Sequence, residues 1–212
     1  MNMRRMTALS LLLCLLLPLI LALSACGEKD APTESFAADI AAVADDAAWL
    51  AMALYGDGLP VTGQATGARY RPVEGSVRGR YGIDSAADIR ARISATYDAA
   101  LAARLLRRYF PEAEGVTGKE GELLLDRYKD APDGTLLCDT QAESLFAGEI
   151  SLDLSSLSAP TVRGNYATAT LQTTMTVGVG AAARSETRTL SYTFVYEGGS
   201  WYFGSVPGFV CE

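Results

Sequence analysis

The side chains that most often perform acid–base and metal chemistry are sparse in this chain. Histidine is absent from all 212 residues, so neither a Ser-His-Asp nor a Cys-His mechanism can be assembled. Its absence also removes the commonest metal ligand and the only side chain whose ordinary pKa lies near neutrality. The four cysteines contain no CxxC spacing. We therefore expect no metal and no cofactor.

One arrangement without histidine stays open, a tyrosine beside a carboxyl group whose pKa is raised by burial. The candidates are Tyr55 or Tyr97 with Asp126, although nothing in their spacing requires them to converge. We therefore predict that the protein is not an enzyme and assign no catalytic residue. A histidine-free enzyme using such a Tyr/Asp pair is the weakest alternative.

The thiol of Cys26 follows a long apolar run near the N-terminus. Arg4 and Arg5 form a positive n-region, residues 6–25 carry no charge, and small residues precede the cysteine, which is the layout of an export signal. The segment Leu23-Ser24-Ala25-Cys26 resembles the lipobox of bacterial lipoproteins. This resemblance implies that the signal peptide is cut before Cys26 and that the thiol is diacylated.

Two alternatives are an uncleaved transmembrane helix, for which about 20 apolar residues suffice, and ordinary secretion. All three place the remaining chain outside the cytoplasm. Because two acyl chains anchor a protein stably, we expect a lipoprotein at the outer face of the cytoplasmic membrane. It would comprise a signal peptide over 1–25, an acylated Cys26 with a tether over 26–35, and a single domain over 36–212.

Charge limits the partners of this domain. Without residues 1–25, which hold two arginines and no acids, 16 basic and 25 acidic residues remain, a net charge of −9. This balance argues against nucleic acid, whose binding needs clustered positive charge. It also argues against adsorption to anionic lipid, so we expect membrane contact through the acyl chains on Cys26.

Cys138 and Cys211 are left as an even pair once the signal peptide and the lipidated cysteine are set aside. Outside the cytoplasm, a disulfide between them is the default expectation. The alternative is two separate buried thiols.

The segment 36–110 has helical patterning. Apolar residues at alternating steps of four and three predict an amphipathic helix from Phe36 to Leu54. Ser85 with Asp88 matches a capping box, and the helical pattern behind it breaks near Thr96-Tyr97-Asp98, which predicts two short helices. Five arginines lie off the apolar stripe, and we interpret them as a solvated helix face rather than a patch for an anionic wall polymer: Arg90, Arg92, Arg104, Arg107 and Arg108.

The segment 120–206 has the period of two that is typical of strands. Strands are expected over 150–155, 167–177 and 190–196, and a further short strand is expected near Tyr70. Gly198-Gly199 suits a two-residue hairpin turn, since glycine accepts positive φ. This turn sets Tyr196 opposite Trp201, and Phe194 opposite Phe203.

Helices first and strands last predict an α+β domain, with N-terminal helices packed on one face of a C-terminal curved antiparallel sheet. The aromatic side chains of the hairpin would then share one sheet face. We expect them to form core, and the alternative is a platform for a small ligand walled by Tyr192, Tyr196 and Trp201.

The helices followed by Phe-x-Tyr-x-Gly-Gly-x-Trp-x-Phe over 194–203 resemble the nuclear-transport-factor-like, cystatin-like cone. Residues 69–206 also resemble the IseA family of inhibitors of cell-wall DL-endopeptidases. The residues that carry this second resemblance are Tyr70-Arg71-Pro72-Val73, the segment from Ser85 to Phe110, Gly121-Glu122-Leu123-Leu124, and Thr193-Phe194-Val195-Tyr196 with Trp201. It implies an architecture and a role, but no functional residue.

These observations predict a lipid-anchored module that binds a protein of the cell envelope, with a cell-wall hydrolase that it inhibits as one candidate partner. Binding of a small ligand in a sheet pocket is the main alternative.

Overall fold

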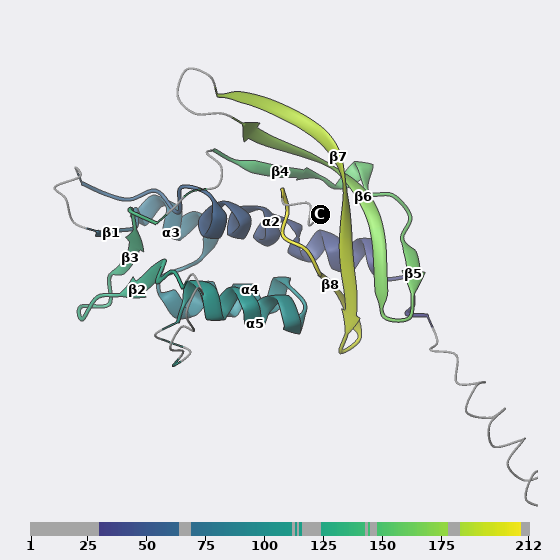
Figure 1. The fold of residues 1–212 in the computed structure, drawn as a ribbon, viewed down its shortest axis with the longest axis horizontal. Coiled ribbons are helices and arrows are strands. Elements are labelled where there is room, and N and C mark those ends of the chain that lie inside the picture. The colour runs from purple at the N-terminus through teal and green to yellow at the C-terminus, as the bar shows by residue number, and fades with distance from the viewer. Residues whose placement is uncertain are drawn as a thin grey trace, which may run out of the picture.

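A computed structural model describes residues 30–63, 69–111, 113, 115, 124–142, 144, 148–177 and 183–208. Helices lie beneath a curved antiparallel sheet, and a smaller sheet lies at the far end of the helices (Figure 1). The helices are α2 (Phe36–Tyr55), α3 (Gly75–Tyr81), α4 (Ala86–Thr96), α5 (Ala99–Tyr109) and the 3-10 turn η1 (Leu154–Ser156). The strands are β1 (Tyr70–Pro72), β2 (Tyr128–Asp130), β3 (Leu136–Asp139), β4 (Ile150–Asp153), β5 (Thr161–Arg163), β6 (Tyr166–Val177), β7 (Arg184–Glu197) and β8 (Ser200–Phe203).

Helix α2 is the amphipathic helix that the apolar stripe predicts. Ser35 occupies its N-cap, but the Ser35 hydroxyl donates to the Asp39 carboxylate (2.9 Å) instead of accepting from a backbone N–H group. The same carboxylate accepts the backbone N–H of Trp201 (3.1 Å). The first turn of α2 is therefore fastened to strand β8.

The capping box at Ser85 is confirmed. The Ser85 hydroxyl accepts from the Asp88 N–H (3.2 Å), and the Asp88 carboxylate accepts from the Ser85 N–H (2.9 Å). The predicted break into two helices is also confirmed, because α4 ends at Thr96 and α5 begins at Ala99. Asp98 caps α5 by accepting backbone N–H groups of its first turn.

The short helix and strands outside the large sheet were only partly predicted. Residues 61–83 contain the expected strand β1, but they also contain helix α3, which ends at Gly82 in the left-handed conformation (φ +63°). Strands β1, β3 and β2 form a separate three-stranded antiparallel sheet with β3 at its centre. Strands of three or four residues are too short to show a period of two, so the sequence pattern missed this sheet.

The large sheet has the strand order β4-β6-β7-β8, and β5 also pairs with β6. The predicted hairpin register is confirmed, with Tyr196 opposite Trp201 and Phe194 opposite Phe203. Gly198 and Gly199 both adopt positive φ (58° and 98°), which explains why glycine occupies both turn positions.

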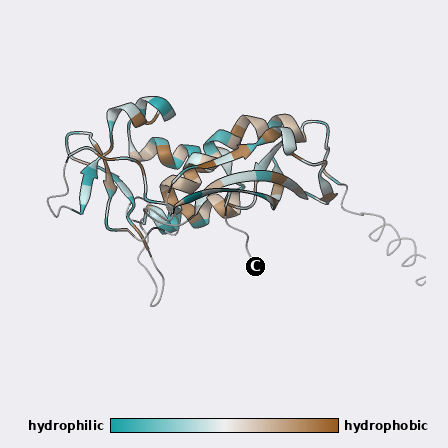
Figure 2. Cartoon of the chain, turned by 90° about the horizontal axis from the view of Figure 1, so that it is seen from above, coloured by the Kyte–Doolittle hydropathy of each residue, from teal (hydrophilic) through white to brown (hydrophobic). Residues whose placement is uncertain are grey.

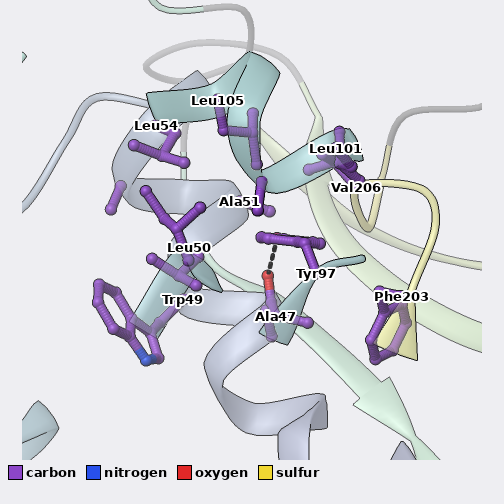
Figure 3. Packing of buried hydrophobic residues seen from close by; sticks show 14 of the residues in the cluster. Ala47, Trp49, Leu50, Ala51, Leu54, Tyr97, Leu101, Leu105, Phe203 and Val206 are labelled. Carbon is purple, nitrogen blue, oxygen red and sulfur yellow. Dashed lines mark hydrogen bonds between the residues drawn. The ribbon is translucent and has the colours of Figure 1, made fainter. Parts of the chain in front are cut away.

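One face of the large sheet packs on α2. The Phe36 ring meets the rings of Phe194 and Trp201 edge to face, with centroids 5.1 and 5.4 Å apart. Deeper in the core, the Tyr97 hydroxyl donates to the Ala47 carbonyl (3.3 Å; Figure 3). Hydrophobic and hydrophilic segments alternate along the helices and strands (Figure 2), as elements with one buried face require. The structure thus confirms the predicted α+β class.

Candidate functional site

The three aromatic side chains proposed as walls of a ligand pocket occupy two kinds of environment. Tyr192 and Trp201 are buried, with 2% and 1% of their surface exposed. The Tyr192 hydroxyl bonds the Thr173 hydroxyl, and burial raises the pKa of Tyr192. The Trp201 Nε1–H donates to the Pro32 carbonyl (2.8 Å). Tyr196 is half-buried and lines a depression of about 630 Å³ beside residues 30–34.

The tyrosine that meets Asp126 is Tyr70 of strand β1. Its hydroxyl donates to the Asp126 carbonyl (2.8 Å) and carboxylate (3.2 Å). Partial burial, followed by the Asp126 charge, raises the pKa of Tyr70 to about 12. Tyr97 instead donates to Ala47 in the core, and the Tyr55 ring packs on Tyr109 (5.4 Å between centroids). A phenol with so high a pKa stays protonated at neutral pH and acts here as a hydrogen-bond donor.

Cys138 is buried at the centre of the small sheet, and burial raises the pKa of its thiol. A protonated, inaccessible thiol is a poor nucleophile. Cys211 lies outside the described residues, so the disulfide between the two cysteines stays a prediction.

Two absences hold for the part of the chain that the structure describes. In that part, no three histidine, cysteine, aspartate or glutamate side chains are grouped closely enough to hold a metal ion. Within the same ranges, no helix combines the length and apolar character needed to cross a bilayer. Cys26 and the apolar run before it lie outside them.

A cleft of about 480 Å³ opens between the C-terminal half of α2, the end of α3 and the edge strand β4. We call it the Trp49 cleft. Its lining combines aromatic rings, charges of both signs and the backbone of β4: Asp45, Asp46, Ala48, Trp49, Met52, Arg80, Tyr81, Arg92, Glu149, Ile150, Ser151 and Leu152.

Trp49 forms one wall of the cleft through a stacked pair with Tyr81. The two ring centroids lie 5.0 Å apart at an interplanar angle of 27°. The indole N–H donates to the Asp46 carboxylate (2.8 Å), which fixes the orientation of the ring. In Figure 3, Trp49 lies at the rim of the hydrophobic cluster, on the side away from Phe203. Trp49 itself is buried, with 5% of its surface exposed, so the half-buried Tyr81 ring forms the accessible face of the stacked pair.

Charged groups surround this aromatic surface. The Arg80 guanidinium lies over the Tyr81 ring (5.3 Å to the centroid). Asp46 also accepts from Arg92 of α4 (2.7 Å). Because 42% of the Arg92 side chain is exposed, this ion pair contributes at most about 1 kcal/mol to stability. Its main effect is to hold Asp46 in place beneath the indole.

Strand β4 contributes to the cleft an edge with which no other described strand pairs. The backbone N–H groups of Thr170 and Gln172 in β6 donate to the hydroxyls of Ser158 and Ser156. The even-numbered residues of this part of β6 therefore direct their backbone N–H and C=O groups toward the side on which β4 pairs. Ser151, opposite Thr174, therefore directs its backbone groups to β6. Ile150 and Leu152 must direct theirs to the open edge, where the cleft lies.

This combination suits an extended peptide segment. Such a segment adds to a free strand edge through backbone hydrogen bonds, and adjacent pockets select its side chains. This site was not predicted, although the sequence contains one signal of it. Trp49 does not belong to the apolar stripe of α2, so this large aromatic side chain falls on the helix face that the stripe leaves to polar residues.

Comparisons with protein-family models, with curated proteins and with solved structures found no match to this chain. The resemblances to bacterial lipoproteins, to the nuclear-transport-factor-like cone and to the IseA inhibitors therefore stay predictions that rest on the residues quoted above.

Proposed function

We propose that this protein is a lipid-anchored interaction module at the outer face of the cytoplasmic membrane, and that it binds an extended segment of a cell-envelope protein in the Trp49 cleft. Cys26 carries the acyl chains. The partner class that the sequence resemblance favours is a cell-wall hydrolase, which the module would inhibit.

The observation that carries the proposal is the edge of β4, left unpaired by the described strands, beside the stacked rings of Trp49 and Tyr81. The outward N–H and C=O groups of Ile150 and Leu152 supply the bonds that an added strand requires. The half-buried Tyr81 ring, held in place by its stacking on the buried Trp49, supplies an aromatic contact surface, and aromatic side chains dominate binding energy at protein interfaces. Binding a peptide segment in this way requires no catalytic side chain.

Charge supports a basic partner segment. The cleft lining holds three carboxylates, from Asp45, Asp46 and Glu149, against two arginines, of which Arg92 is paired with Asp46. The mature chain as a whole has a net charge of −9. An acidic domain attracts a basic segment of the partner at long range, so the association rate should fall as salt is raised and the Debye length shrinks.

The test is capture of wall proteins by the mature chain at low salt, with two variants of equal charge change. Asp45→Lys reverses an exposed carboxylate in the cleft lining. Asp57→Lys makes the same change at an exposed position of the loop after α2 that is not part of the cleft lining.

We expect the wild type and Asp57→Lys to retain the same wall protein, and Asp45→Lys to lose it, because a cation in the cleft repels a basic segment. Retention by Asp45→Lys would contradict the cleft as binding site. Loss in Asp57→Lys alone would place the binding surface outside the cleft. Recovery of no protein by the wild type would contradict the proposed function itself.

A further inference from the structure

We infer that one end of the domain rests on the bilayer surface, with Tyr166 in the headgroup layer of zwitterionic phospholipids. This end consists of residues 30–34, the β5–β6 turn and the β7–β8 turn. The inference rests on the proposed acylation of Cys26, and it adds an orientation and a lipid contact to that anchoring.

The first step is that the segment after the anchor is fastened to this end. The Ala31 N–H donates to the Gly164 carbonyl (2.8 Å), and the Gly164 N–H donates to the Asp30 carboxylate (2.8 Å). The Pro32 carbonyl accepts the indole N–H of Trp201 (2.8 Å). The second half of the expected tether is therefore part of the folded body.

The second step is a limit on distance. Four residue steps separate Cys26 from Asp30. Because a fully extended chain advances at most 3.3–3.6 Å per residue, these steps span about 14 Å or less. An acylated thiol in the bilayer must therefore hold the Asp30 end of the domain close to the lipid headgroups.

The third step is the surface that this end presents. Figure 1 shows the β5–β6 and β7–β8 turns side by side at the end where the described chain begins, and the small sheet at the opposite end. Tyr166 lies directly after the β5–β6 turn and is 56% exposed, the one exposed large hydrophobic side chain among the residues that the structure describes. Tyrosine is enriched at membrane–water interfaces, because its ring is apolar and its hydroxyl is polar.

The fourth step concerns the kind of lipid. Arg163 is the only basic residue within 30–34, 163–166 and 196–200, and these ranges also hold Asp30, Glu34 and Glu197. Anionic lipid attracts clusters of lysine and arginine. This end has no such cluster, so contact should be with zwitterionic headgroups and should depend little on salt.

The experiment places a tryptophan at either end of the acylated full chain in phosphatidylcholine vesicles that contain brominated lipid, which quenches nearby indoles. Tyr166→Trp probes the inferred contact. Gly79→Trp is the matched control, since Gly79 lies on an exposed face of α3 with no atom near its Cβ position. The native Trp49 and Trp201 are buried and give a constant background.

We expect the added tryptophan of Tyr166→Trp to show blue-shifted emission that the brominated lipid quenches, equally at low and high salt. The emission of Gly79→Trp should be quenched by the brominated lipid no more than that of the parent. Inserting a 20-residue Gly-Ser linker after Gly27 should relieve the quenching, because such a linker spans about 25 Å.

Vesicle-bound protein with equal quenching at both positions, or with none at Tyr166→Trp, would overturn the orientation while leaving the anchor intact. Protein that fails to associate with vesicles would contradict the proposed anchor and the orientation together. Each variant is first checked for the wild-type unfolding temperature.

Discussion

Gly58 has a backbone conformation and surroundings that leave little room for another side chain. Its φ is +84°, and a Cβ atom there would lie 2.8 Å from the Cys138 sulfur and 2.9 Å from the Arg127 guanidinium. Arg127 is itself fully buried and donates to the Gly56 carbonyl. The loop after α2 therefore closes directly over a buried cation and thiol.

We predict that Gly58→Ala lowers the free energy of unfolding by more than about 1 kcal/mol, through left-handed strain and this close approach. Gly79→Ala, in open space on helix α3, should instead raise it by about 0.5–1 kcal/mol. Urea unfolding of both variants measures the difference. Equal effects would mean that the loop after α2 does not pack as described.

Tyr97 gives the fold a sensitivity to alkaline pH. Burial raises its pKa well above the ordinary value, and neighbouring Tyr55 and Asp46 raise it further. The group stays protonated in the folded state and releases its proton on unfolding, so its contribution is complete below the unfolded pKa of about 10 and is lost as pH rises above it.

We predict that Tyr97→Phe costs about 1 kcal/mol at pH 8, for the lost hydrogen bond to Ala47. The variant should then lose less stability than the wild type between pH 9 and pH 11. Tyr166→Phe, at an exposed position, should behave as the wild type throughout. Identical pH slopes in all three proteins would contradict the burial of the Tyr97 hydroxyl.

At the scale of elements, long and strongly patterned segments were predictable. The stripe of α2, the capping box at Ser85 and the Gly198-Gly199 hairpin all reflect local rules that operate over a few residues. Helix α3 and the sheet of β1, β2 and β3 were not predictable in this way. Each is short, and β1 finds its partner β3 more than sixty residues away, so long-range pairing decides its structure.

The Trp49 cleft shows the same limit for function. Trp49 off the apolar stripe is a local signal, but its partners Tyr81 and Ile150 come from distant segments. Tyr70 was likewise not expected beside Asp126, because the small sheet that positions it was not expected.

The third prediction concerns the backbone N–H group of Leu152 in strand β4. Leu152→Pro and Leu152→Ala lose the same half-buried side chain, but only proline removes the outward N–H group. If a partner strand bonds this edge, proline should weaken binding of the captured wall protein about tenfold more than alanine does, the equivalent of one hydrogen bond. Equal affinities, measured by titration of the purified partner, would exclude strand addition at β4.

At the scale of the whole molecule, the proposed anchor and the cleft would lie at different heights above the membrane. Helix α2 begins at the end that is fastened to residues 30–34, and Trp49 follows Phe36 by thirteen residues. At 1.5 Å per residue, this places Trp49 about 20 Å farther along the helix axis. The cleft would therefore lie on the wall side of the acylated end, which would stay on the lipid.

Acylation of Cys26 is the central claim, and replacing its thiol by a hydroxyl tests it most directly. Cells that express the wild type or Cys26→Ser are fed labelled palmitate and separated into membrane and soluble fractions. We predict that the wild type carries label and sediments with the membrane, and that Cys26→Ser is unlabelled and leaves the membrane fraction. Full-length, membrane-bound Cys26→Ser would contradict the claim, because the apolar run itself would then hold the chain.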